Sequence, residues 1–163
     1  MSDFAPTEAR LDVTRGKYPA FPRAPAILVR LIKHLYKEIH DEANAAMRPH
    51  GLNHPEYNIL MMLYGAPDNT LTPSELAGAA GEKSANVTRL TTQLSEKGYI
   101  ARAGSEDDRR KVALSLTPEG VALIERFLPD IVTLLHRQTR NLSAGEQAQL
   151  EALLKKMLVG FGE

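Results

Sequence analysis

The sequence has no cysteine. A chain without cysteine forms no disulfide, no thiolate metal site and no thiol redox switch. It also has no run of eighteen apolar residues, which excludes a membrane-spanning helix. The stretch up to Pro22 lacks the apolar segment that a signal peptide needs. We therefore expect a cytoplasmic protein that does not enter a membrane.

Motifs of catalysis are missing too. The chain has no phosphate-binding glycine loop, no Gly-x-Ser-x-Gly nucleophile elbow and no His-Glu-x-x-His zinc helix. Gly78, Gly81 and Gly98 stand where helices are expected to end. We predict that the protein is not an enzyme and needs no cofactor.

An excess of one charge is also absent, because 20 Lys and Arg balance 20 Asp and Glu. Domains that bind duplex DNA usually carry a basic surplus, so the total charge does not indicate nucleic-acid binding. The distribution matters more than the total. Between Lys83 and Lys111 the basic residues modestly outnumber the acidic ones, which is the direction that DNA binding requires.

The most informative part of the chain begins with a predicted helix over residues 84–97. Its apolar residues Val87, Leu90 and Leu94 have helical spacing, so this face is expected to pack inward. The opposite face is small, polar or basic. Gly98 follows where a helix would end.

A predicted hairpin comes next. Residues 99–102 and 112–116 alternate in polarity as paired strands do, and residues 103–111 between them are too polar to be buried. A helix beside a charged hairpin is the layout of a winged helix-turn-helix. We predict a mainly α fold with a small β-hairpin wing.

Helix signals recur before and after this region. The sequence predicts helices over residues 25–48 and 55–65, and a short helix that begins with a capping box of Thr72 and Glu75. Two short helices joined by a glycine-containing turn form a helix-turn-helix. A long helix is predicted to begin at Thr117, with a kink or break at Pro129.

A last helix is predicted to begin at Ser143, which is its N-cap, with the acidic Glu146 at N3 as in a capping box. The two ends of the chain thus carry more apolar helical faces than one small winged domain can bury, which favours burial against a second copy. We expect a flexible or loosely docked arm over residues 1–24 and a single domain over 25–163. In that domain, residues 25–52 and 118–163 would form a helical dimerisation region, and 53–117 the winged helix-turn-helix.

Five motifs carry a family resemblance: Pro73-Ser74-Glu75-Leu76-Ala77, Val87-Thr88-Arg89-Leu90, Leu94-Ser95-Glu96-Lys97-Gly98-Tyr99-Ile100, Asp108-Arg109-Arg110 and Leu116-Thr117-Pro118-Glu119-Gly120. Their order and spacing resemble the MarR family of winged-helix transcription regulators, from about Leu31 to the C-terminus. Within that family, the recognition-helix start and the wing look most like the EmrR (MprA) branch, which represses multidrug efflux genes.

The resemblance implies a homodimer whose two recognition helices and two wings face double-stranded DNA. Relatives mostly repress transcription by occupying a palindromic promoter site. Many are released by a small phenolic or aromatic carboxylic ligand, bound between the dimerisation and DNA-binding parts. We therefore expect operator DNA, a second copy of the chain and a small aromatic effector as partners.

The outer face of the predicted recognition helix supplies the candidates for reading DNA: Ser84, Asn86, Thr88, Arg89 and Thr92. Asn and Arg make bidentate contacts to adenine and guanine edges, while Ser and Thr hydroxyls contact bases or phosphates. Thr88 is flanked by Val87 and Leu90 and is alternatively partly buried. The alternative for the whole face is a solvated helix surface without a partner.

The predicted wing supplies further candidates. The resemblance implies that Arg109 enters a narrow A·T-rich minor groove, and that Asp108 and Arg110 brace the wing. Lys111 and Arg102 are candidates for phosphate contacts. The alternative is an ordinary charged turn.

For an effector pocket the candidates lie on the helices that line the site in relatives: His34, Tyr36, Glu38, Tyr57, Met61 and Tyr64. Histidine and tyrosine can hydrogen-bond a carboxylate or phenol, and methionine offers an adaptable apolar wall. The alternative is core and dimer packing. A zinc site without cysteine would need several histidines to converge, so we predict no metal. A metal-responsive regulator, a ligand-independent one and a protein-interaction winged helix are the other interpretations.

Replacing Arg109 with alanine tests the wing assignment. We expect Arg109→Ala to weaken operator binding without unfolding the protein, because the change removes a minor-groove contact and no core contact. The measurement is operator affinity at matched salt. An unchanged affinity would contradict the assignment.

Overall fold

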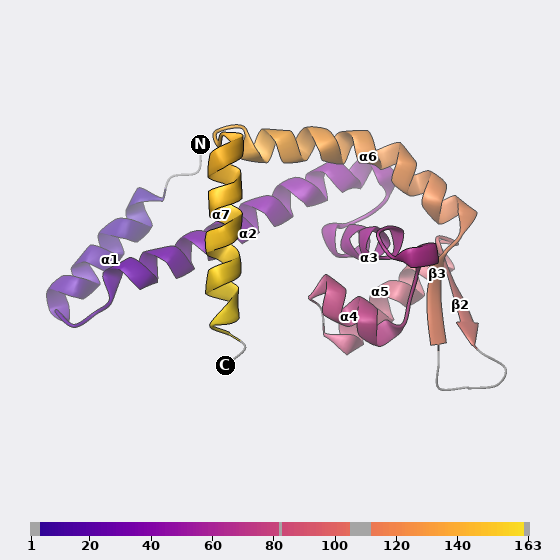
Figure 1. Ribbon diagram of the computed structural model, residues 1–163, viewed down its shortest axis with the longest axis horizontal. Helices are drawn as coiled ribbons and strands as arrows, with labels where there is room; N and C mark the ends of the chain where they lie inside the picture. Colours follow the sequence, from indigo (N-terminus) through magenta and orange to yellow (C-terminus); the bar gives the residue numbers. More distant parts are fainter. Residues whose placement is uncertain (1–3, 82, 105–111, 162–163) are drawn as a thin grey trace. The chain divides into compact units, whose positions relative to one another are not determined.

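The computed structural model describes residues 4–81, 83–104 and 112–161. The chain divides into two compact units, one up to Glu42 and one from Ala43 onwards. Figure 1 shows the elements of both. None of the described helices is long and apolar enough to cross a membrane.

The first unit contains α1 (Ala5–Lys17) and most of α2 (Arg23–Met47). Helix α1 falls in the segment expected to be an arm, and the sequence pattern did not predict it. The sequence of α1 has few large apolar residues and so no apolar stripe for periodicity to detect. In the structure only Leu11 of this helix is buried. Arg23 joins the two helices, because its Nη2 donates to Asp12 Oδ2 at 3.0 Å. The hydrogen bonding of Arg23 lowers the pKa of the Asp12 carboxyl below its usual value.

The second unit is built around α3 (His54–Tyr64). Ile59, Leu60 and Leu63 of α3 are fully buried, as its nearly all-round apolar sequence predicts. Helices α4 (Pro73–Ala80) and α5 (Ser84–Glu96) pack against α3 and against each other. Two residues from the last turns of α2, Ala43 and Met47, complete the same core.

A small antiparallel sheet lies beside these helices (Figure 1). Strand β2 (Ile100–Gly104) pairs with β3 (Val112–Leu116), with Ile100 opposite Leu116 and Gly104 opposite Val112. The predicted hairpin strands are thereby confirmed. A third strand, β1 (Thr70–Leu71), pairs with the other edge of β3. Strand β1 was not predicted, because two residues are too few to show alternation.

Side-chain caps set where the helices begin. Thr72 and Glu75 form the predicted capping box of α4. Because the backbone N–H and the hydroxyl of Thr72 donate to Glu75, they lower the pKa of that carboxyl. Helix α7 (Ala144–Val159) begins with the predicted box of Ser143 and Glu146. These helix starts were readable from sequence because each cap is local.

The sequence predicted a kink or a break at Pro129, and helix α6 (Pro118–Thr139) runs through this residue without a break. Proline removes the N–H that would bond to the carbonyl four residues earlier. Pro129 lies on the exposed side of the helix, where water can solvate the freed carbonyl. The opposite side of α6 buries Leu123, Ile124 and Phe127.

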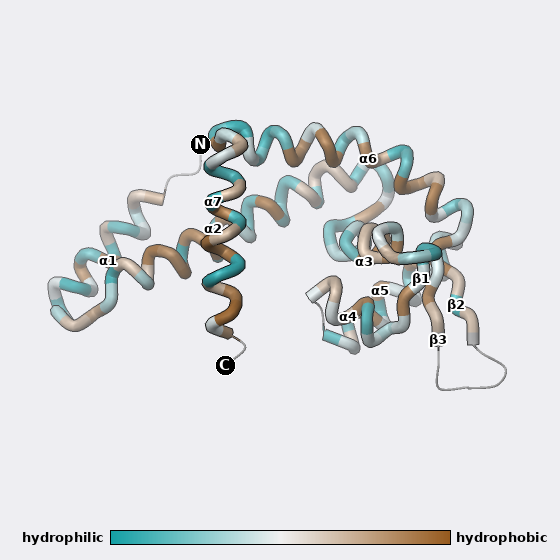
Figure 2. The backbone as a smooth tube through the Cα atoms, viewed as in Figure 1, coloured by the Kyte–Doolittle hydropathy of each residue, from teal (hydrophilic) through white to brown (hydrophobic). Residues whose placement is uncertain are grey.

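Large apolar side chains stay exposed on three helices, and Figure 2 shows hydrophobic segments recurring along α2, α6 and α7. They include Leu28, Val29, Leu35, Val132, Leu135, Leu153, Leu154 and Leu158, each 45% exposed or more. Helix α7 buries none of its residues. Helical faces of this kind remain available to another surface.

Gly120 is required where α6 meets the start of β2. A Cβ atom built on Gly120 would lie 2.3 Å from the carbonyl oxygen of Tyr99, a backbone atom that cannot rotate away. We expect Gly120→Ala to lower the free energy of unfolding by about 3 kcal/mol, the upper end for overpacking. Urea unfolding at one fixed protein concentration measures it.

Gly78 provides the matched control, since it lies inside α4 and a Cβ atom built on it would meet nothing within 4 Å. Gly78→Ala should raise the stability by about 0.5–1 kcal/mol through helix propensity. Equal effects of the two substitutions would contradict the proposed clash.

Candidate nucleic-acid interface

Helix α5 has one buried and one outward face, and the burial of its apolar stripe decides which is which. Val87, Leu90 and Leu94 are at most 1% exposed. The sequence-predicted candidates therefore point outward: Ser84, Thr88, Arg89 and Thr92 are exposed, and Asn86 is half-buried. The structure thus brings these five predicted side chains onto one helix face. Thr88 is exposed, not partly buried.

Arg89 is held in place by two amides on the same face of α5. Its Nη2 donates to Asn86 Oδ1 at 2.8 Å, and its Nη1 donates to Gln93 Oε1 at 2.9 Å. A planar guanidinium that is fixed before binding loses less entropy when it meets a guanine edge. Sequence reasoning missed Gln93, although its position four residues after Arg89 is a signal for such a pair.

Arg102 on β2 reaches α5. Its Nη2 lies 2.9 Å from the hydroxyl oxygens of both Thr91 and Thr92 and 3.4 Å from the Thr88 carbonyl oxygen. Thr91 is only 2% exposed and was also missed. The sequence feature that could have revealed Thr91 is its place in the apolar stripe, since it is a polar residue four positions after Val87 and three before Leu94.

Four predicted wing residues, Asp108, Arg109, Arg110 and Lys111, lie outside the described residues. The strands that lead to them are paired as far as Gly104 and Val112. The roles given to these four side chains remain predictions.

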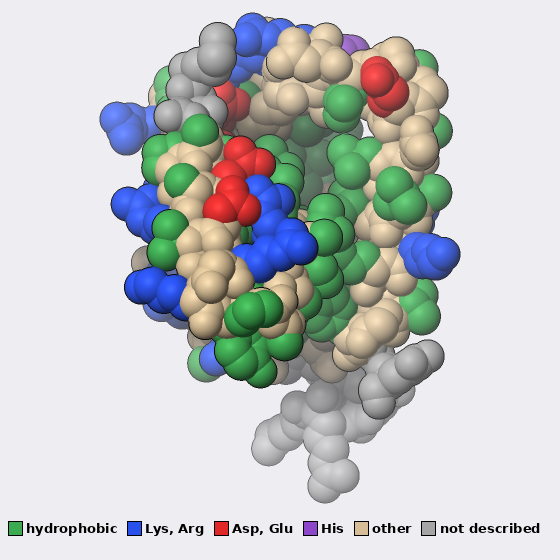
Figure 3. Space-filling view, turned by 90° about the vertical axis from the view of Figure 1, so that its left-hand side faces the viewer, with side chains coloured by type: hydrophobic (Ala, Val, Ile, Leu, Met, Phe, Trp, Pro, Cys, Tyr) green, Lys and Arg blue, Asp and Glu red, His purple; other side chains and the backbone are tan. Residues whose placement is uncertain are grey.

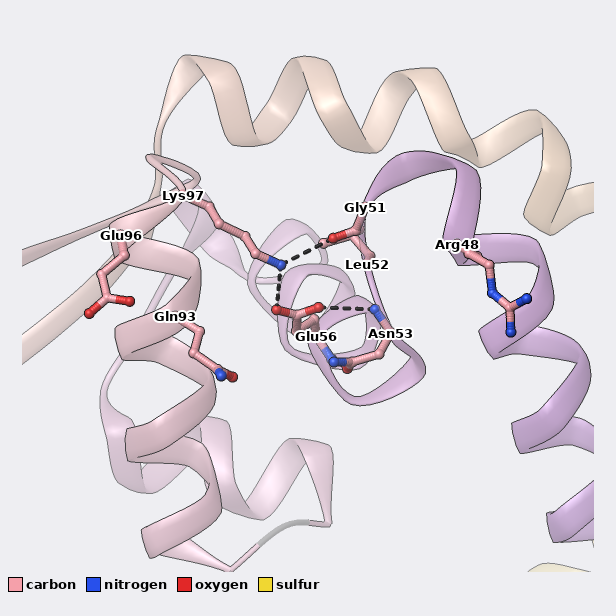
Figure 4. Close-up of a pocket in the computed structure, with 8 residues that line it drawn as sticks. All are labelled: Arg48, Gly51, Leu52, Asn53, Glu56, Gln93, Glu96 and Lys97. Carbon is pink, nitrogen blue, oxygen red and sulfur yellow. Dashed lines mark hydrogen bonds and ion pairs between the residues drawn. The ribbon is translucent and has the colours of Figure 1, made fainter.

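Lys97, the C-cap of α5, ties the end of that helix to the α2–α3 connection (Figure 4). Its Nζ donates to Glu56 Oε1 at 2.7 Å and to the Gly51 carbonyl oxygen at 3.1 Å. Glu56 also belongs to the capping box of α3, where its other oxygen accepts from Asn53 N at 3.0 Å. The side chains of Glu56 and Lys97 are 5% and 38% exposed. A carboxylate this buried requires its cation.

A hollow of about 650 Å³ lies beside this ion pair. In Figure 4 one side of the hollow is lined by Gln93 and Glu96 of α5 and by the C-cap residue Lys97. Arg48 lies on the opposite side, and Glu56 lies between the two. The hollow therefore has one wall made of the last turn of α5.

The six predicted effector residues fall into both units. In the first unit, His34 makes an edge contact with the ring of Phe4, with centroids 5.8 Å apart, and lies 3.8 Å from Glu38 Oε1. Tyr36 is 65% exposed. In the second unit, Tyr57, Met61 and Tyr64 pack against the core.

Tyr57 has the most defined environment of these six. Its ring makes an edge contact with Phe127, with centroids 5.7 Å apart, and stacks on His54. Burial raises the pKa of the Tyr57 hydroxyl, because the charged form loses hydration. The hydroxyl is therefore the neutral, donating form over the physiological range. Among the described residues, no three His, Asp or Glu side chains are placed to share a metal ion.

Comparisons with known proteins agree with this geometry. The MarR family model matches residues 52–112. The transcriptional repressor MprA of Escherichia coli K12 is 31% identical over 157 residues, which cover 96% of this chain and 89% of MprA.

Solved structures are similar as well. A cysteine-to-serine mutant of Escherichia coli MarR in complex with operator DNA superimposes with a TM-score of 0.74 at 30% identity, covering 80% of this chain and 93% of that one. Bordetella bronchiseptica BpsR, whose DNA binding is regulated by 6-hydroxynicotinic acid, has the same fold at 23% identity. Its TM-score is 0.70, over 78% of this chain and 90% of BpsR.

The ion pair of Lys97 and Glu56 generates a stability prediction. Lys97→Met leaves a buried carboxylate without its cation and should cost about 2–3 kcal/mol, somewhat less than for a fully buried pair. Adding Glu56→Gln should restore part of this loss, because glutamine keeps the capping-box contacts without a charge. Urea unfolding of the single and double variants measures both effects.

Lys155→Met is the matched control, since Lys155 pairs with Glu151 on the exposed surface of α7. It should change stability by no more than about 0.5 kcal/mol. A double variant no more stable than Lys97→Met alone would show that the unpaired charge is not the cause.

Proposed function

Because the chain belongs to the MarR family of DNA-binding transcriptional regulators, we propose that it is a homodimeric repressor. In this proposal it occupies a palindromic promoter site and leaves it when a small phenolic or aromatic ligand binds. The observation that carries the proposal is the outward face of α5. That face presents a guanidinium fixed by two amides, Asn86 and Gln93, beside exposed hydroxyls.

The geometry supports a division of labour in DNA binding. Helix α5 enters the major groove, where Arg89 reads a guanine edge and Asn86 an adenine edge. Ser84, in the first turn of the helix, contacts the flanking backbone. The hydroxyl of Thr88 donates its hydrogen to the Ser84 carbonyl oxygen at 3.0 Å, so Thr88 contacts DNA by accepting from a base donor. In the same proposal, Arg109 enters the minor groove and Lys111 contacts a phosphate. Two such helices must lie about 34 Å apart, one turn of DNA, to read both half-sites at once.

Exposed apolar helix faces support the dimer. Leu28 and Leu35 on α2, Leu135 on α6 and Leu153 and Leu158 on α7 are each more than half exposed. The space-filling view shows hydrophobic side chains spread over one face of the molecule among groups of charged ones (Figure 3). A second copy that covers residues 25–52 and 118–163 would remove this surface from water.

Release by an effector follows the logic of linked equilibria. A ligand shifts the dimer away from DNA only if it binds the DNA-incompetent arrangement of the two α5 helices more tightly than the competent one. Regulation of BpsR by 6-hydroxynicotinic acid supports an aromatic acid as the ligand class. The residues proposed to receive it are His34, Tyr36, Glu38, Tyr57, Met61 and Tyr64, with the neutral Tyr57 hydroxyl as a donor to its carboxylate.

Titration of the protein with duplexes from the region upstream of its own gene tests this function. Wild-type protein should protect a palindromic site, and Arg89→Ala should bind it about 1–3 kcal/mol less tightly, with relaxed preference at one base pair of each half-site. A series of aromatic acids added to the complex should include one that releases it. Equal affinity of Arg89→Ala for every duplex that the wild type binds would contradict the base-reading role.

Arg15→Ala gives the control, since Arg15 is exposed in the last turn of α1, outside the residues proposed to bind DNA or the second copy, and carries the same charge. It should leave site preference unchanged. A dimer that retains full operator affinity at saturation with each acid would contradict release by this ligand class, while leaving DNA binding intact.

A further inference from the structure

We propose that Arg102 is a positioning residue, which fixes the wing strand β2 against α5 through the hydroxyls of Thr91 and Thr92 instead of binding a DNA phosphate. The inference rests on the proposed function only in that α5 and the wing must engage one duplex together. Its structural basis is a closed set of hydrogen bonds within the second unit.

The direction of each hydrogen bond follows from which groups carry a hydrogen to donate, since a guanidinium only donates and a carbonyl oxygen only accepts. Thr91 and Thr92 both donate their single hydroxyl hydrogen to the Thr88 carbonyl oxygen, at 3.2 and 2.8 Å. Each hydroxyl oxygen is then left with acceptor capacity only. Arg102 Nη2 fills it by donating to both oxygens at 2.9 Å.

Arg102 and Thr92 are themselves exposed, and the buried partner of this contact is Thr91. Thr91 is 2% exposed, so a hydroxyl without a hydrogen-bond partner there would cost stability. Arg102 also shares its side of β2 with Ile100, which is 3% exposed, because residues two apart on a strand point the same way. The guanidinium therefore approaches α5 from the packed side of the sheet.

The same contacts change the role proposed for Thr92. Its hydrogen is used on Thr88 and its oxygen accepts from Arg102. A phosphate oxygen only accepts hydrogen bonds, so Thr92 has no hydrogen left to offer it. The set formed by Thr88, Thr91, Thr92 and Arg102 joins helix and strand, while Arg89 and Asn86 remain the base-reading pair.

Operator titrations of full-length variants at several salt concentrations distinguish positioning from phosphate binding. Arg102→Lys keeps the charge but loses the planar fork, and a phosphate contact accepts lysine as a point charge. If Arg102 is a positioning residue, Arg102→Lys should bind the operator about tenfold more weakly than the wild type. Thr91→Val, which removes a buried hydroxyl and changes no charge, should weaken binding to the same extent. Thr91→Ser keeps the hydroxyl and should bind like the wild type.

Two further readouts separate positioning from a general loss of stability. All titrations are made where circular dichroism shows each variant to be fully folded. The slope of log K against log salt should be unchanged in Thr91→Val and Arg102→Lys. For Arg102→Gln a lost phosphate contact would make it shallower by about 0.9 per contact, and positioning predicts no such change. The double variant Arg102→Gln/Thr91→Val should bind no more than about twofold worse than Arg102→Gln alone.

Wild-type affinity in Thr91→Val or Arg102→Lys, a shallower salt slope in Arg102→Gln, or additive effects in the double variant would each overturn the proposal. A wild-type protein that bound no duplex would contradict the proposed repression instead. Arg102→Gln, Thr91→Val and their double variant would then be compared with the wild type by urea unfolding. Additive losses of stability there would show that Arg102 and Thr91 are not coupled, which would also overturn the inference.

Discussion

Burial of the apolar stripe of α5 is the constraint on which the rest of the structure depends. Val87, Leu90 and Leu94 leave water in a core shared with α3, α4 and β2, where Ile59, Leu60 and Leu63 of α3 are fully buried. This contact rotates α5 so that its polar face points outward. Without it the side chains proposed to read DNA would share no common surface, however well suited each is chemically.

Apolar packing sets the rotation of α5 about its axis, and polar contacts fix the position of its C-terminal end and of the side that faces β2. At its C-terminal end Lys97 reaches the buried Glu56, and along its flank Thr91 and Thr92 meet Arg102. Hydrogen bonds are directional and buried charges tolerate little displacement, so such contacts specify one arrangement where apolar contact alone permits several. This precision suits a helix that must fit a groove of fixed width.

Local signals explain what sequence reasoning predicted well. The capping boxes at Thr72 and Ser143, the stripe of α5 and the strands beside the wing each depend on residues close in the chain. Strand β1 and helix α1 were missed because one is too short and the other has too little apolar periodicity. Of the kink or break expected at Pro129, the break did not occur, since water on the exposed side of the helix can solvate the carbonyl that loses its partner.

The sequence by itself determined the order of the helices from α2 onwards, the winged-helix layout and the family, because motif spacing and helix periodicity are carried by neighbouring residues. Only the tertiary structure decided that Lys97 meets a carboxylate 41 positions away and that Arg102 turns toward α5. Such pairings depend on how separate elements pack and on which rotamers that packing admits, and no local pattern encodes either.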